Sequence, residues 1–170
     1  MTERPADWES PVVVPEAAVP ERILVPFDGS HNAERALAWA RIIALGTGSE
    51  VLVLVGYTQP LTMRGRGAAY VEAVRDELAD EAAELAREGV QVLVTAGVQA
   101  RGIVLKGDIT RGILETAAQE GCGLILLGRQ GLTAEVGGVS GAAGMIRDLL
   151  QGGVSEKVTR HAEVPVLVVP

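Results

Sequence analysis

The sequence predicts an α/β fold, in which a parallel β-sheet is covered by helices on both faces. Short apolar segments alternate along the chain with longer segments whose apolar residues recur at helical spacing. Residues 51–55 are apolar at every position, which is typical of a strand covered on both faces. Hydrophobic residues make up 48% of the chain but aromatic residues only 3%, so we expect a core of aliphatic side chains that lets helices pack closely on the sheet.

Residues 1–21 differ in composition from the rest of the chain. Prolines at positions 5, 11, 15 and 20, with acidic residues between them, predict an extended, flexible N-terminal tail. Trp8 and the valines at 12–14 leave the alternative that this segment lies along the sheet or on a partner. We expect one folded domain over residues 22–170.

Local signals define the elements of the first half of the domain. An apolar run that begins at Arg22 ends in Asp28 and Gly29, and Ser30 is placed to cap the helix that follows. The elements expected here are a strand from 22 to 27, a helix over 31–45, a strand over 51–55, a mobile loop over 59–68 and a helix over 69–88.

Gly89 is expected to end the second helix, and residues 90–94 are expected to form the third strand. The stretch 95–106 is ambiguous, because it either prolongs that strand or forms an added hairpin. Asp108 is placed to cap the next helix. The remaining elements expected are a helix from 108 to 119, a strand over 124–127, a helix over 154–162 and a strand over 166–169.

Charge and cysteine content narrow the class of protein. A net charge of −7 disfavours non-specific binding to nucleic acid or to anionic membranes. No apolar run approaches the roughly 20 residues of a membrane-spanning helix, and the N-terminus lacks the pattern of a signal peptide. The lone Cys122 precedes an apolar strand, so we expect a buried, inert thiol in a reducing compartment. We therefore expect a cytoplasmic protein.

Two strand ends carry the candidate binding residues. Asp28 ends the first strand and Gly128 the fourth, and ligands of open α/β sheets bind beyond the carboxyl ends of the strands. Gly128 and Gly131 would let a backbone approach a phosphate, and Gly152-Gly153 precedes a helix whose N-terminus would face the same anion. The alternatives are an ordinary turn, a helix N-cap and, for Asp28, an Asx turn.

Together these residues resemble the universal stress protein family over most of 22–170. Nucleotide-binding members carry glycine, two residues, glycine, nine residues, glycine and then serine or threonine. Gly128, Gly131 and Gly152 match the glycines, but twenty residues separate the last two here, and Gly153 stands where the hydroxyl belongs. A register on Gly141 restores the nine but places Ala142 at the hydroxyl position.

The resemblance implies a fold, a ligand and an assembly. The fold would be a Rossmann-like or flavodoxin-like three-layer sandwich of the adenine nucleotide alpha hydrolase-like kind, with a five-stranded parallel sheet. The ligand would be ATP or AMP, with or without Mg²⁺. Family members commonly pair their last strand, here 166–169, across a two-fold axis, so the resemblance implies a homodimer.

The same resemblance implies roles for individual residues. Asp28 would contact the nucleoside, and Pro26 and Leu127 would contact the base. Gly56 replaces a larger apolar residue of the family and would keep only a backbone contact. The implied phosphate side consists of Gly128, Arg129, Gly131, Gly152, Gly153 and Val154, in which Arg129 either reaches phosphate or is simply solvated.

Residues 133–144 form a glycine-rich insertion between the two glycine elements. We expect a flexible lid over the nucleotide or, together with residues up to 150, a surface for a protein partner; the alternative is a lengthened surface loop without a role.

The motifs of several enzyme classes are missing from the sequence. It contains no P-loop, no Gly-x-Ser-x-Gly elbow and no Cys-x-x-Cys pair, and its two histidines, His31 and His161, fall in helices. Dedicated catalysis is not expected, and slow ATP hydrolysis is the most that Asp28 with a bound magnesium nucleotide would support. The sequence leaves two functions open: an adenine-nucleotide-binding regulatory module, and a dimeric interaction module that has lost nucleotide binding.

Overall fold

A five-stranded parallel sheet forms the centre of the computed structural model, which describes residues 19–58, 68–129 and 153–170. The strand order is β3-β2-β1-β4-β5, so the α/β class and the parallel sheet are as predicted. The strands are β1 (Arg22–Pro26), β2 (Glu50–Tyr57), β3 (Ala100–Lys106), β4 (Leu124–Gly128) and β5 (Val166–Val169). The helices are α1 (His31–Thr47), α2 (Ala68–Thr95), α3 (Ile109–Gln119) and α5 (Val154–His161).

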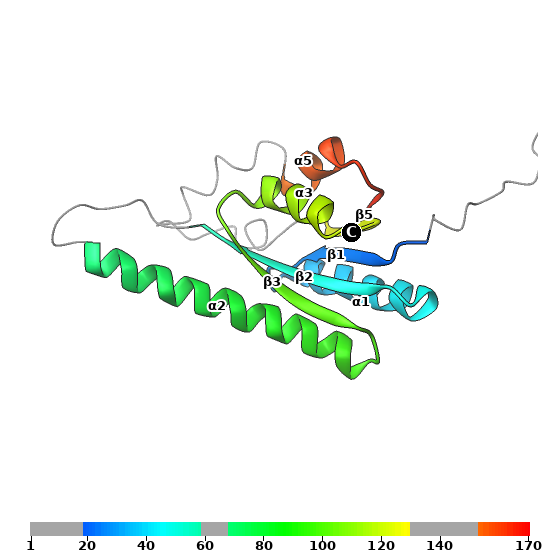
Figure 1. The fold of residues 1–170 in the computed structure, drawn as a ribbon, viewed down its shortest axis with the longest axis horizontal. Coiled ribbons are helices and arrows are strands. Elements are labelled where there is room, and N and C mark those ends of the chain that lie inside the picture. The colour runs from blue at the N-terminus through cyan, green and yellow to red at the C-terminus, as the bar shows by residue number, and fades with distance from the viewer. Residues whose placement is uncertain (1–18, 59–67, 130–152) are drawn as a thin grey trace, which may run out of the picture.

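The helices cover the sheet in two layers, with a separate apolar cluster on each face. One cluster joins alternate strand residues such as Val25 and Val53 to α1 and α2, and the other joins Leu24 and Leu52 to α3 and α5. This alternation follows from the pleat of a strand, which points successive side chains to opposite faces. Figure 1 shows α3 and α5 together on one side of the sheet and α2 on the other.

The third strand was wrongly predicted. Residues 90–94 continue α2, which runs through Gly89 to Thr95, and β3 occupies Ala100–Lys106 as a separate strand. A β-carbon at Gly89 would lie 3.0 Å from Val53 Cγ1 and 3.3 Å from Phe27 Cδ1. The glycine therefore allows the helix to lie close to the sheet and does not end it. The segment 95–106 is neither a prolongation of an earlier strand nor a hairpin.

The predicted helix caps are confirmed. The Ala33 amide donates to Ser30 Oγ at 3.2 Å, and the Arg111 amide donates to Asp108 Oδ1 at 2.9 Å. Residues 1–18 of the predicted tail (1–21), the insertion 133–144 and residues 59–67 of the expected loop lie outside the described residues. Within the described part of the chain, no helix is long and apolar enough to cross a membrane.

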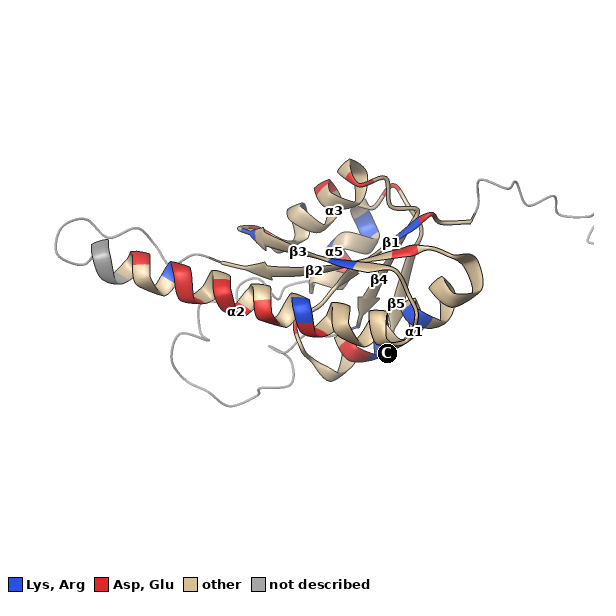
Figure 2. Cartoon of the chain, turned by 60° about the horizontal axis from the view of Figure 1, so that its bottom comes forward, with Lys and Arg blue, Asp and Glu red and all other residues tan. Residues whose placement is uncertain are grey.

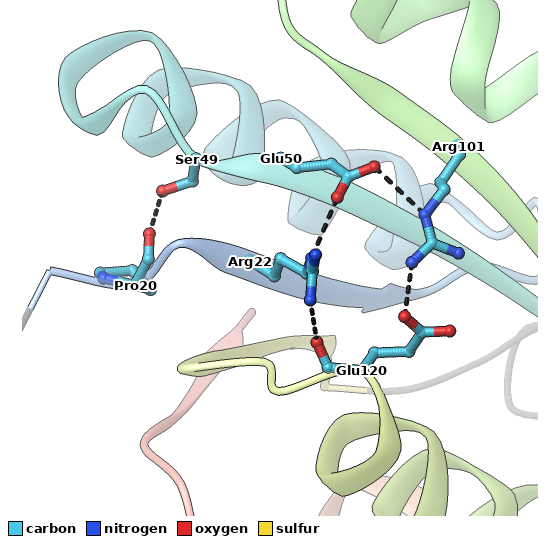
Figure 3. A network of polar contacts seen from close by, with 6 residues as sticks. All are labelled: Pro20, Arg22, Ser49, Glu50, Arg101 and Glu120. Carbon is cyan, nitrogen blue, oxygen red and sulfur yellow. Dashed lines mark hydrogen bonds and ion pairs between the residues drawn. The ribbon is translucent and has the colours of Figure 1, made fainter.

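A network of charged side chains ties together the amino ends of three strands (Figure 3). Glu50 at the start of β2 accepts hydrogen bonds from Arg22 of β1 and from Arg101 of β3, each at 3.1 Å. Arg101 also pairs with Glu120, which follows α3, and Arg22 donates to the Glu120 carbonyl at 2.6 Å. The hydrogen bond to Glu120 is the main cause that raises the pKa of Arg101 above its usual value. The network connects the amino ends of these strands, and therefore lies at the end of the sheet opposite to the carboxyl ends of the strands.

Candidate functional site

A cleft of about 1150 Å³ lies at the carboxyl edge of the sheet. The ends of β1, β2 and β4 and the N-termini of α1, α3 and α5 contribute to it. Eight of the ten predicted site residues line this cleft: Pro26, Asp28, Gly56, Leu127, Gly128, Arg129, Gly153 and Val154. The other two, Gly131 and Gly152, lie outside the described residues. The cleft therefore collects predicted site residues that are up to 128 positions apart in the sequence, from Pro26 to Val154.

Asp28 is held at the cleft by the turn that follows β1. The Ser30 amide donates to Asp28 Oδ1 at 3.0 Å, which is the Asx turn considered as an alternative for this residue. Asp28 is also partly exposed and lines the cleft. The turn and a ligand contact are compatible, because the turn fixes the direction in which the carboxylate points.

Gly128 is required by the packing of β4 on α1. A β-carbon at this position would lie 2.7 Å from the carbonyl carbon of Asn32 and 2.8 Å from its oxygen. The Gly128 carbonyl accepts a hydrogen bond from Ser155 Oγ at 2.7 Å. The next amide, that of Arg129, donates to the Val169 carbonyl at 2.8 Å and is therefore used within the fold. Close backbone packing thus accounts for this glycine without a phosphate, while the Arg129 side chain is exposed at the cleft.

Gly153 opens the N-terminus of α5 into the cleft. It is the N-cap residue, with φ −54° and ψ 165°, and as a glycine it has no side chain to cap the helix. Among the described residues, no atom lies within 4 Å of the place where its β-carbon would be. The first turn of an α-helix presents amide groups and the positive end of the helix dipole, which favour a bound anion. The geometry of the site at Gly153 would accommodate the hydroxyl-bearing residue that the family resemblance expects.

Several cleft residues were missed by the sequence analysis. Asp108 and Ile109 lie at the start of α3 and line the cleft. They were overlooked as site residues because the third strand was expected at 90–94, whereas β3 ends at Lys106, close before them. Ser155 was missed because its side chain bonds to a carbonyl 27 positions away. The remaining missed residues include Thr58, Thr159 and Arg160.

The charges around the cleft are mixed, although the chain as a whole is acidic. Three acidic residues (Asp28, Asp108 and Glu156) and two arginines (Arg129 and Arg160) line it. Much of the negative charge lies instead on α2, where acidic residues recur along the helix (Figure 2). All seven acidic residues of α2 are exposed and none lines the cleft: Glu72, Asp76, Glu77, Asp80, Glu81, Glu84 and Glu88. The net charge of the chain is thus a poor guide to the charge at the site.

The floor of the cleft is apolar and its rim is polar. Pro26, Leu54, Ile113 and Leu127 provide the apolar surface, and backbone groups, hydroxyls and the charged side chains surround it. An apolar surface with a few polar groups around it is typical of small-molecule binding sites. The buried Cys122 does not line the cleft, and burial raises the pKa of its thiol to about 11.

Comparison with known sequences identifies the family. A sequence model of the Universal stress protein family matches residues 20–170, which include the whole sheet and every lining residue of the cleft. The chain belongs to this family. The resemblance inferred from the glycines and Asp28 is therefore confirmed at the level of the family.

Two curated universal stress proteins resemble this one over most of their length. Universal stress protein YxiE of Bacillus subtilis (strain 168) is 30% identical over 158 residues, covering 87% of this chain and 97% of that protein. The "Universal stress protein in QAH/OAS sulfhydrylase 3'region" of Thermus aquaticus is 32% identical over 147 residues, covering 86% of this chain and 96% of that protein.

Solved structures of the family share the fold of this universal stress protein. Hypothetical protein MJ0577 superimposes with a TM-score of 0.71 at 24% identity, covering 89% of this chain and 96% of that one. A universal stress protein in complex with cAMP has a TM-score of 0.63 at 23% identity, covering 89% and 98%. One from Archaeoglobus fulgidus in complex with dAMP has a TM-score of 0.53 at 21% identity, covering 89% and 99%.

Proposed function

We propose that this universal stress protein binds an adenine nucleotide, ATP or AMP, in the cleft and acts as a regulatory module in the cytoplasm. One observation carries the proposal: Pro26 and Asp28 from the end of β1 meet Leu127 and Gly128 from the end of β4 in one cleft. In the order β3-β2-β1-β4-β5, the chain reverses its direction of travel across the sheet between these two strands. Ligands of open α/β sheets bind at such switch points.

The parts of a nucleotide match different parts of the cleft. The apolar floor suits the base, and the Asp28 carboxylate suits ribose hydroxyls or a base amine, which are hydrogen-bond donors. The N-terminus of α5 at Gly153 suits the phosphates. The complexes that two solved relatives form with cAMP and dAMP support an adenine nucleotide as the ligand class.

Magnesium would arrive with the nucleotide. Among residues 19–58, 68–129 and 153–170, no three His, Cys, Asp or Glu side chains lie together in a way that could hold a metal ion. Phosphate oxygens and water supply most ligands of nucleotide-bound Mg²⁺, so the ion would be carried by ATP and not by a cage of side chains.

We further propose that the protein works as a homodimer through β5. This strand lies at one edge of the sheet, and Leu167 and Val168 are 37% and 36% exposed there. An unpaired edge strand with aliphatic side chains favours pairing with a second strand. The proposal that 133–150 contacts a protein partner concerns residues outside the described part of the chain.

The second candidate is a dimeric interaction module without a nucleotide. Two observations favour it: Gly153 lacks a capping hydroxyl, and the nearby Ser155 hydroxyl donates to the Gly128 carbonyl. The cleft would then be a remnant of the fold.

The test begins with protein purified without added nucleotide and then denatured, so that mass spectrometry can identify any small molecule released. The same protein is titrated with Mg·ATP by calorimetry. We expect ATP or AMP in near-equal amount, or a titration that Asp28→Asn weakens at least about tenfold. Asparagine can still accept from the Ser30 amide, so this variant removes the charge and keeps the turn.

Asp80→Asn on α2 is the matched control, because Asp80 is exposed and does not line the cleft. Its affinity should equal that of the unsubstituted protein. A protein that carries no nucleotide and gives no heat with ATP, AMP or adenosine would favour the interaction module.

A further inference from the structure

Ile109 occupies the space that a side chain at Gly56 would fill. A β-carbon built on Gly56 would lie 2.0 Å from Ile109 Cδ1 and 3.3 Å from Ile109 Cγ1. Both residues line the cleft, Gly56 from the end of β2 and Ile109 from the start of α3. The terminal methyl group of Ile109 therefore lies directly over the backbone of β2 at the carboxyl edge of the sheet.

The position of Ile109 is well determined by its surroundings. It is the first residue of α3 and follows the N-cap Asp108, whose carboxylate accepts from the Arg111 amide at 2.9 Å. Its side chain is partly buried and packs on the apolar cluster beneath α3, which includes Leu54 and Ile113. A fixed backbone and a half-buried, β-branched side chain provide a rigid surface toward the cleft.

The strand order separates this surface from the anion side of the cleft. β2 and β4 lie on opposite sides of β1, so Ile109 over β2 and the α5 N-terminus beside β4 flank the central Asp28. A nucleotide whose phosphates face α5 and whose sugar faces Asp28 would direct its base toward Ile109. Aliphatic groups are good packing partners for the faces of an apolar planar ring.

We propose that Ile109 forms the wall of the base subsite, in place of a side chain at Gly56. This inference rests on the proposed nucleotide-binding function. It makes the base subsite a composite of β2 and α3, in which one aliphatic wall can be supplied from either element.

Truncation of Ile109 tests the wall directly. Ile109→Val removes only Cδ1, the atom nearest to the Gly56 position, and Ile109→Ala removes most of the side chain. A buried methylene is worth roughly fourfold in affinity, so we expect a loss of about fourfold for valine and tenfold or more for alanine. The probes are ATP, AMP and adenosine, measured by calorimetry. The fold-loss of affinity should be the same for all three ligands, because they share the base and differ only in their phosphates.

Moving one methyl group between the two residues tests the composite. In the double variant Gly56→Ala with Ile109→Val, the new β-carbon lies within about 2.0 Å of the deleted Cδ1 position. The backbone of Gly56 does not have a positive φ, so alanine suits its conformation, and the nearest of the Ile109 atoms that valine keeps, Cγ1, lies 3.3 Å from the new β-carbon. We expect the double variant to bind within about twofold of the unsubstituted protein. Gly56→Ala alone should bind more weakly, because both groups then compete for one place.

Ile103→Ala is the matched control for lost stability. Ile103 is another partly buried isoleucine packed on the same cluster, but it does not line the cleft. Thermal unfolding of every variant confirms that it is folded at the temperature of the titration. Ile103→Ala should lower the unfolding temperature and leave the three affinities unchanged.

The outcomes separate the inference from the function on which it rests. If the unsubstituted protein binds the probes and Ile109→Ala binds them equally well, the proposed role of Ile109 is wrong, while the proposal of nucleotide binding stands. If truncation weakens ATP but not adenosine, Ile109 acts on the phosphates and the inference is also overturned. If the unsubstituted protein binds none of the three probes, the proposed function fails and the inference fails with it.

Discussion

Two glycines of the site serve different purposes, although the sequence presents them alike. Gly128 is hemmed in by the backbone of Asn32 and Ala33, and backbone atoms cannot rotate away as a side chain can. We expect Gly128→Ala to destabilise the protein by about 1–3 kcal/mol through overpacking. Urea denaturation measures the change in unfolding free energy.

Gly46→Ala on α1 serves as the comparison. No described residue has an atom within 4 Å of its added β-carbon, and alanine favours helix over glycine by up to about 1 kcal/mol. The change in unfolding free energy caused by Gly46→Ala should therefore be opposite in sign to that caused by Gly128→Ala. Equal effects of the two substitutions would show that the contact with Asn32 does not constrain β4.

Gly153 is the position where a hydroxyl can be restored. No atom of the part of the chain that the structure describes lies within 4 Å of its β-carbon position, and its dihedral angles suit an N-cap serine. If the α5 N-terminus faces the phosphates, Gly153→Ser should tighten ATP about tenfold, as a hydrogen bond to a charged group would. Calorimetry measures the affinity, and comparison with Gly153→Ala isolates the contribution of the hydroxyl group to it. If Gly153→Ser and Gly153→Ala change the affinity for ATP equally, residue 153 does not contact the phosphates.

Cys122 provides a pH-dependent signal of folding. Burial, with a smaller contribution from Glu120, raises the pKa of its thiol to about 11. Because the unfolded thiol has a lower pKa, the native state retains the proton between the two values. The associated stability is present below the unfolded pKa and is lost as the pH rises toward 11.

We therefore expect iodoacetamide to modify Cys122 much more slowly in the native protein than in urea at about pH 8, since only the thiolate reacts. Mass spectrometry follows the reaction, and free cysteine in the same urea corrects for the solvent. Equal rates in the native and unfolded states would contradict the burial of this thiol.

At the scale of elements, the charged network at the amino edge connects β1, β2, β3 and the end of α3. Glu50 is its centre, because both of its carboxylate oxygens pair with arginines. Its side chain is 28% exposed, so solvent screens the pairs only in part. We expect Glu50→Gln to lower the unfolding free energy by about 1 kcal/mol.

The exposed helix pair of Arg111 and Glu115 provides the control for this prediction. These side chains are 77% and 51% exposed, so Glu115→Gln should lower the unfolding free energy by less than Glu50→Gln does. Urea denaturation at low and high salt compares the two, and high salt should reduce both losses. A loss for Glu50→Gln no larger than that for Glu115→Gln would mean that the network adds nothing to separate pairs.

At the scale of the whole molecule, the sheet has two edge strands, β3 and β5, at which a second copy of the chain could pair. If the homodimer forms through β5, Leu167→Lys should shift it to monomer, because a charge on an edge strand opposes pairing. Val104→Lys on β3 is the matched control at the opposite edge, where Val104 is 42% exposed. Sedimentation velocity distinguishes the species. A dimer that survives Leu167→Lys but not Val104→Lys would place the interface on β3.

The class of fold, most elements and the end of the sheet that carries the candidate site could be predicted from the sequence. Apolar continuity marks a doubly covered strand, and Ser30 and Asp108 mark helix starts, because these signals act within a few residues. Asp28 and Gly128 were placed together by a rule of topology alone, since parallel strands end at one edge. The family motif strengthened that placement.

Features that depend on distances between remote segments could not be predicted and became apparent only in the folded chain. The course of α2 through Gly89 depends on Val53 and Phe27, which allow the helix to lie close only where it lacks a side chain. Likewise, Ile109 fills the space over Gly56 because α3 packs against the end of β2. No pattern within one segment encodes such a contact, since the free volume at each position is set by the other segment.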